Sequence, residues 1–80
     1  MHLQAEYERL RDACPDDLRA AGWHVAIHND YRQEGRDCTF WLLTRPRPGN
    51  PNIGDFVKGE GYGDAQALNQ IRRLLRMLEQ

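Results

Sequence analysis

Aromatic and β-branched residues are concentrated in two runs, 23–28 and 38–44. The segment between them, 29–37, is polar and contains Gly35. A polar, glycine-bearing connection between two such runs is typical of a β-hairpin, so the pattern predicts two antiparallel strands. A third, shorter strand is predicted over 55–60 at the edge of the same sheet, where lysine and glycine are tolerated.

Side chains alternate between the two faces of a strand, so the pattern also predicts which residues lie together. In the first strand Trp23, Val25 and Ile27 share the more apolar face, and His28 belongs to the opposite one.

The second strand is apolar on both faces, because Phe40 and Leu42 share one face while Trp41 and Leu43 share the other. Such a strand is either buried on both sides or presents one face to a partner. Helices on a single side of the sheet would leave one of these two pairs facing outward. We expect the outward pair to form a homodimer or partner interface, since aromatic residues are the usual anchors there.

Helices are predicted both before and after the strands along the chain. Apolar residues in 3–14 recur at steps of three and four, which indicates one amphipathic helix. Pro15 suits the start of a second, short helix with Asp16 and Asp17 in its first turn, where carboxylates favour the positive end of the helix dipole. Asp64 is predicted to be the N-cap of the last and best-defined helix.

These elements predict a single α+β domain over 1–80, a three-stranded antiparallel sheet with helices on one face. The element order, α-α-β-β-β-α, resembles the topology of double-stranded RNA-binding domains. The segment 45–52 has three prolines and is expected to be an extended loop.

Composition and charge narrow the class of protein. The 80 residues are 40% hydrophobic and 29% charged, which is typical of a globular chain, and the apolar runs are too short to span a membrane. Residues 1–37 carry eight acids and five bases, a net charge of −3, whereas residues 38–80 carry four acids and six bases, a net charge of +2. The chain begins without a signal-like apolar segment, so we expect a cytoplasmic location.

The sequence contains no strong catalytic pattern, so we expect neither an enzyme nor a cofactor. Gly59, Gly61 and Gly63 alternate, a spacing that matches no phosphate-binding loop. His24 and His28 would lie ~13 Å apart on one strand, too far to share a metal ion. His28, Asp30 and Cys38 could converge as a thiol nucleophile with a base, but surface residues beside a semi-buried thiol explain them better. Cys14 and Cys38 are expected to be reduced thiols.

Nucleic-acid binding is the alternative function. Double-stranded RNA-binding domains hold phosphates with lysines at the start of the last helix, whereas this helix begins with Gly63 and Asp64. The net charge of −1 also disfavours this alternative. The residues that would serve it are the arginines of the loop 45–52 and of the C-terminal helix, namely Arg45, Arg47, Arg72, Arg73 and Arg76.

A further resemblance covers most of the chain. It is carried by Gly22-Trp23-x-Val25-x-Ile27-His28, Thr39-Phe40-Trp41-Leu42, Val57-Lys58-Gly59-Glu60-Gly61 and Asp64-Ala65-Gln66-Ala67-Leu68. With these segments the chain resembles small proteins of phages and prophages, and it is similar to anti-CRISPR inhibitors.

The resemblance implies binding to a host Cas effector and a block of target DNA binding or nuclease recruitment. Acidic side chains would then occupy a basic nucleic-acid channel of the effector. The expected partner-binding residues are Asp12, Asp16, Asp17, Asp30, Glu34, Asp37, Trp41 and Leu43.

Overall fold

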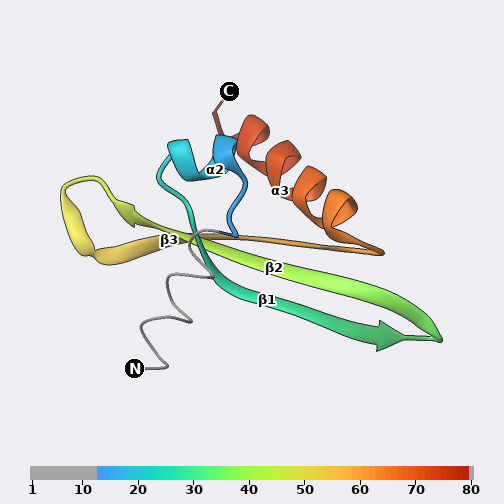
Figure 1. Ribbon diagram of the computed structural model, residues 1–80. Coiled ribbons are helices and arrows are strands. Elements are labelled where there is room, and N and C mark those ends of the chain that lie inside the picture. The colour runs from blue at the N-terminus through green and yellow to red at the C-terminus, as the bar shows by residue number, and fades with distance from the viewer. Residues whose placement is uncertain (1–12, 80) are drawn as a thin grey trace.

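The computed structural model describes residues 13–79, except for the side chain of Pro51 (Figure 1). Its elements are, in chain order, α2 (Asp16–Ala20), β1 (His24–Gln33), β2 (Arg36–Arg47), β3 (Asn50–Gly61) and α3 (Asp64–Leu78). The strands form one antiparallel sheet in the order β1-β2-β3, and both helices lie on the same side of it (Figure 1). The predicted α+β class and three-stranded antiparallel sheet are therefore confirmed. The described order of elements is α-β-β-β-α. Residues 3–12 of the helix predicted over 3–14 lie outside the described residues.

The β1–β2 hairpin is longer than the sequence pattern predicts. Its turn consists of Glu34 and Gly35 alone, with φ angles of 54° and 78°. Two consecutive positive φ angles are the geometry of a type I′ turn, whose twist matches that of the flanking strands. The polar segment 29–37 is therefore mostly strand rather than connection. It is polar because the hairpin extends beyond the part of the sheet that the described helices cover.

The predicted loop over 45–52 is instead a second hairpin with its turn at Pro48 and Gly49. Strand β1 pairs with β2 only as far as Thr44. Beyond that residue β2 has a single neighbour, so the missing amide of Pro46 breaks no bond to β1. The edge strand β3 tolerates proline for the same reason.

A β-bulge in β1 changes the predicted faces of this strand. The register shifts between Val25 and Ile27, so that Val25 lies opposite Leu43 while His28 lies opposite Trp41. The extra residue moves every later side chain of β1 to the other face. Ile27 is therefore 40% exposed on the outer face. His28 was expected on the other face of the strand from Val25, but it lies with Val25 on the helix-covered face.

The core lies between the sheet and the helices. Trp41 and Leu43 belong to it, with exposed fractions of 4% and 0%. Of the two pairs that could face outward, this pair, named among the expected partner-binding residues, is the buried one. Phe40 and Leu42 occupy the opposite face and are partly exposed. The core cluster consists of Cys14, Leu18, Trp23, Val25, Trp41, Leu43, Val57, Ala67, Leu68 and Ile71.

The glycines of β3 allow α3 to lie directly on the sheet. A Cβ atom at Gly59 would meet the carbonyl oxygen of Ala67 and would lie 2.8 Å from Cγ1 of Ile71. Larger residues there would push the helix away. Cys14 and Cys38 are both buried and free of disulfide bonds. Among the described residues, no helix is long and apolar enough to cross a membrane.

Candidate functional site

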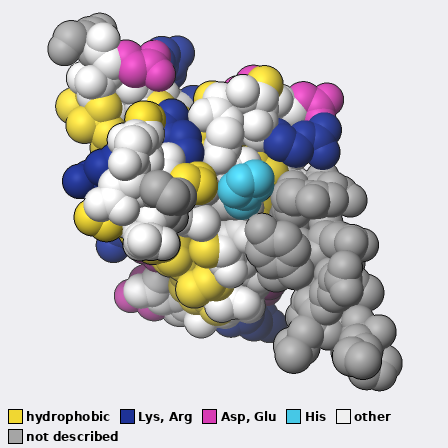
Figure 2. All heavy atoms as spheres, turned by 90° about the vertical axis from the view of Figure 1, so that its left-hand side faces the viewer, with side chains coloured by type: hydrophobic (Ala, Val, Ile, Leu, Met, Phe, Trp, Pro, Cys, Tyr) yellow, Lys and Arg dark blue, Asp and Glu magenta, His cyan; other side chains and the backbone are white. Residues whose placement is uncertain are grey.

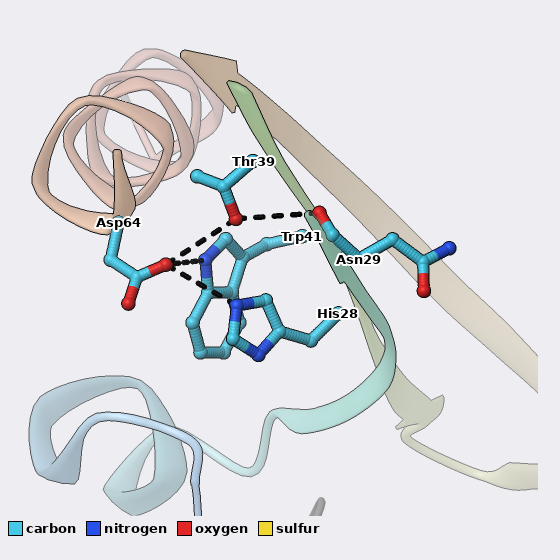
Figure 3. A network of polar contacts seen from close by, with 5 residues as sticks. All are labelled: His28, Asn29, Thr39, Trp41 and Asp64. Atoms are coloured by element: carbon cyan, nitrogen blue, oxygen red, sulfur yellow. Dashed lines mark hydrogen bonds and ion pairs between the residues drawn. The ribbon is translucent and has the colours of Figure 1, made fainter. Parts of the chain in front are cut away.

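Asp64 connects the last helix to the sheet. It is the first residue of α3, and the N-cap is Gly63, so the N-cap role predicted for Asp64 is wrong. Its side chain turns toward the sheet instead, where Oδ1 accepts a hydrogen bond from Nε1 of Trp41 over 3.0 Å (Figure 3). Nε2 of His28 lies 3.2 Å from the same oxygen. The His28 ring is stacked on the Trp41 indole, with centroids 3.9 Å apart.

Thr39 completes this network. Its hydroxyl oxygen lies 3.4 Å from Oδ1 of Asp64 and 3.4 Å from the backbone carbonyl of Asn29 (Figure 3). In a catalytic triad the base stands between the nucleophile and the carboxylate. Here the carboxylate stands at the centre, and no hydrogen bond between described residues joins Thr39 to His28. The geometry is that of a structural connection between strand and helix.

The thiol site considered from the sequence is not assembled. Cys38 lies opposite Tyr31 in the strand register, whereas Asp30 lies opposite Thr39, on the other face of the hairpin. The Cys38 sulfur is directed to the carbonyl of Arg36, 3.7 Å away. Within residues 13–79, no three His, Cys, Asp or Glu side chains are grouped as metal ligands would be.

A hollow of about 430 Å³ lies beside this network, and we call it the hairpin notch. It forms because β3 ends at Gly61, opposite Thr39, whereas β2 begins three residues earlier at Arg36. The uncovered end of the hairpin and the start of α3 then form its walls. The notch is lined by Asp30, Tyr31, Arg32, Asp37, Cys38, Thr39, Tyr62, Gly63 and Asp64.

Carboxylates outnumber bases in the hairpin notch. Asp30, Asp37 and Asp64 line it, and Arg32 is the one cation among its lining residues. Nε of Arg32 lies 3.4 Å from Oδ1 of Asp37, and both side chains are more than two-thirds exposed. Glu34, at the adjacent turn, lines a separate hollow together with Arg36. The structure thus brings together two of the predicted acids, Asp30 and Asp37, and it adds Asp64, which was predicted only as a helix cap.

The other predicted acids are in a different place. Asp16 and Asp17 lie on α2, before the start of β1, and the ten residues of β1 correspond to about 30 Å of strand. Asp17 accepts two hydrogen bonds from Arg72, of 3.0 and 3.1 Å, which hold α2 against α3. These bonds lower the pKa of Asp17. Asp16 is paired with Arg19 at 2.7 Å, and Asp12 lies outside the described residues.

Most of the arginines named for the nucleic-acid alternative are paired within the chain. Arg47 donates to Asp55 over 3.0 Å, and Arg72 is bound to Asp17. Arg45 lies over the Trp23 ring, 4.4 Å from its centroid. Within residues 13–79, Arg73 and Arg76 have no carboxylate within 4 Å.

No protein-family model, characterised protein or solved structure matches this chain.

Proposed function

We propose that this chain is a non-catalytic inhibitor that binds another protein, with the hairpin notch as its contact for a basic surface. The observation that carries the proposal is the convergence of Asp30, Asp37 and Asp64 around one hollow. Asp30 and Asp37 are exposed and come from two paired strands, so their spacing is held by the sheet. Carboxylates on a rigid hairpin favour a cationic partner and accelerate its association.

The outer face of the sheet, opposite the face that carries Asp30 and Asp37, supplies a second and apolar area. Ile27 lies opposite Leu42 in the register, and Phe40 lies two residues before Leu42 on the same face. Ile27 is exposed, and the other two are partly exposed. Apolar side chains are the usual anchors of protein interfaces. We therefore propose this face for the partner contact that was first expected of Trp41 and Leu43.

The narrower proposal is that the partner is a Cas effector, as the resemblance to anti-CRISPR inhibitors implies. The nucleic-acid channel of such an effector is basic, and an acidic hairpin would compete there with the phosphates of guide or target. The chain would then act by occupying the channel, which requires no reaction.

RNA binding, which the predicted resemblance to double-stranded RNA-binding domains raised, is less favoured. Those domains place lysines at the start of the last helix, where this chain has Asp64. Asp30 and Asp37 add further negative charge beside that helix start. The position that would hold phosphates therefore repels them.

The test is binding to purified Cas effector complexes at several salt concentrations. The double variant Asp30→Asn, Asp37→Asn should bind more weakly than the wild type, with the largest difference at low salt. Asp16→Asn is the matched control, because Asp16 is an exposed carboxylate on α2. Equal binding by the double variant and the wild type would remove the notch from the interface. Recovery of nuclease-sensitive RNA or DNA, without a protein, would favour the alternative function.

A further inference from the structure

Two glutamine side chains of α3 close one end of the free edge of β3. The side-chain oxygen of Gln70 accepts a hydrogen bond from the amide of Glu60 over 2.7 Å, and that of Gln66 accepts one from the amide of Tyr62 over 2.8 Å. Strand β3 is the outermost strand of the sheet, and both amides point away from β2. Because each already has an acceptor, neither is available to another strand.

The same edge is open farther along the strand. In an antiparallel sheet, every second residue of an edge strand directs its amide and carbonyl away from the neighbouring strand. Glu60 is one of these residues, so Lys58 and Phe56 are the next two, and both are exposed. Within residues 13–79 no side chain accepts a hydrogen bond from their amides. We call the backbone over 56–58 the open edge, because it has the groups that pair with another strand.

Helix α3 forms a wall beside the open edge. Gln66, Gln70, Leu74 and Met77 follow one another at steps of four, four and three, so they share one side of the helix. The two glutamines reach the closed end of the edge in turn, so the helix runs along β3 toward the open edge. Leu74 and Met77 therefore border the open edge, and they are 39% and 63% exposed.

A hollow of about 350 Å³ is lined by residues of the open edge and of the last turns of α3. It forms because α3 contacts the glycines of β3 at its start and rises away from the sheet toward its C-terminus (Figure 1). Phe56 and Val57 line the hollow from β3, and Leu75 and Leu78 line it from α3. Figure 2 views this end of the molecule, where hydrophobic side chains lie among Lys and Arg side chains.

We propose that the open edge binds an extended segment of another protein by β-strand addition, and that apolar and acidic side chains alternate in this segment. Side chains of an added strand alternate between the two faces of the sheet. On the face of α3 they would meet Leu74, Met77 and the hollow, which suits apolar residues. On the outer face they would lie beside Phe56 and Lys58.

Charge favours an acidic segment at this edge. Lys58 and Arg73 are exposed, and neither has a carboxylate within 4 Å among residues 13–79. An acidic side chain opposite Lys58 would form a cross-strand ion pair. A lysine on an edge strand disfavours pairing with another basic edge, and a second copy of β3 would bring its own Lys58. The occupant is therefore an acidic segment of a partner rather than a second copy.

The open edge and the hairpin notch are separate contacts. The notch lies beside the start of α3, whereas the open edge lies beside the end of this helix. The notch is acidic and suits a basic surface, whereas the open edge is basic and suits an acidic strand. Loss of one contact should leave the other unchanged, so the two proposals are tested independently.

The test is amide hydrogen exchange of the wild-type protein with a synthetic probe, a blocked peptide in which valine and glutamate alternate. In the free protein the amides of Glu60 and Tyr62 should exchange slowly, and those of Phe56 and Lys58 quickly. The peptide should slow exchange at Phe56 and Lys58 by about tenfold or more and leave the other two unchanged. A peptide with its valines and glutamates in separate blocks is the control.

Two variants separate the backbone contact from the charge. Lys58→Pro removes the outward amide without breaking a bond to β2, whereas Lys58→Ala keeps this amide and removes only the charge. The proline variant should bind the peptide roughly tenfold more weakly than the alanine variant. Equal binding by the two folded variants would overturn the proposal.

Methylated peptides test the same contact on the wild-type protein. Only alternate nitrogens of the peptide face β3, so methylation of one alternate set should abolish binding and methylation of the other should not. An equal effect of both sets would overturn the proposal, as would unchanged exchange at Phe56 and Lys58 with the peptide at millimolar concentration. Protection of these amides that grows with the concentration of the protein alone would assign the edge to a second copy and overturn the proposal equally.

Discussion

The indole N–H of Trp41 donates to Oδ1 of Asp64 over 3.0 Å, which joins the middle strand to the first residue of the last helix. Trp41 is 4% exposed, whereas the Asp64 side chain is 59% exposed. The buried indole N–H therefore has its acceptor in a carboxylate at the rim of the hairpin notch. It also holds the start of α3 in place, and with it one wall of the notch.

Asp64→Ala should destabilise the fold relative to Asp64→Asn. Both variants lose the negative charge at the helix start, but only asparagine keeps an oxygen that can accept from the Trp41 indole. A buried donor without a partner costs about 1–3 kcal/mol, so the difference in unfolding free energy should be of that size. Urea unfolding of the two variants measures it. Equal stability would mean that the indole finds another acceptor.

The Asp17–Arg72 pair should make stability depend on acid pH. Hydrogen bonding to Arg72 lowers the pKa of Asp17 below its ordinary value of 3.8. A carboxyl with a lowered folded-state pKa stabilises the fold above its unfolded-state pKa, and this contribution is lost as pH falls through the folded-state pKa. The pair is exposed, so its contribution is about 0.2–1 kcal/mol.

Arg72→Gln should flatten this part of the stability profile, as measured by urea unfolding at a series of pH values. Arg73→Gln is the control on the same helix, because Arg73 has no carboxylate within 4 Å among residues 13–79. If the two variants show the same acid dependence, another group is responsible for it.

Tyr31 should titrate at unusually high pH. Its hydroxyl donates to Oε2 of Glu60 over 2.9 Å, and this bond raises the pKa of Tyr31 to about 12 from 10.0. Because the folded-state pKa is raised, the bond stabilises the fold fully below pH 10.0, and its contribution is lost as pH rises through about 12.

Glu60→Gln should return the pKa of Tyr31 toward 10.0, because the hydroxyl then faces a neutral amide. An absorbance titration of tyrosinate measures the shift, and Tyr31→Phe identifies which transition belongs to this residue. A high-pH transition that survives Glu60→Gln would show that the carboxylate is not its cause.

Gly59→Ala should destabilise the contact between β3 and α3. The added Cβ would meet the Ala67 carbonyl oxygen and Cγ1 of Ile71, so the helix would have to move, at a cost of about 1–3 kcal/mol. Gly63→Ala should cost less, because nothing lies within 4 Å of its Cβ position and its φ of 162° is extended backbone. Thermal unfolding compares the two, and equal losses would argue against the close approach.

Local patterns in the sequence were sufficient to predict most of the elements. The apolar runs predict β1 and β2, and the apolar stripe of the last helix predicts α3. Pro15 correctly marks the start of α2. The hairpin boundaries were harder to predict from the sequence. Glu34 adopts a positive φ, which in a two-residue turn is usually found at asparagine or glycine.

The acidic surface required strand pairing as well as sequence. Asp30 and Asp37 lie seven residues apart, but the two-residue turn places Asp37 opposite Arg32 and Asp30 opposite Thr39. Asp64 joins them only because α3 begins where β3 leaves the sheet. Asp17 is also an aspartate, but in the folded structure its carboxylate accepts a hydrogen bond from Arg72.

The sequence by itself determined that β2 has two apolar faces, and the tertiary structure decided which of them became the core. Phe40 with Leu42 and Trp41 with Leu43 are nearly equal in hydrophobicity, and strand alternation cannot rank them. The register places Trp41 opposite Gly59 and Leu43 opposite Val57, whereas Leu42 lies opposite Lys58. A helix can approach a sheet closely where glycine leaves space, and it cannot do so over a lysine. The Trp41 face was therefore buried because α3 fits there, which is a property of the paired strands and not of either strand alone.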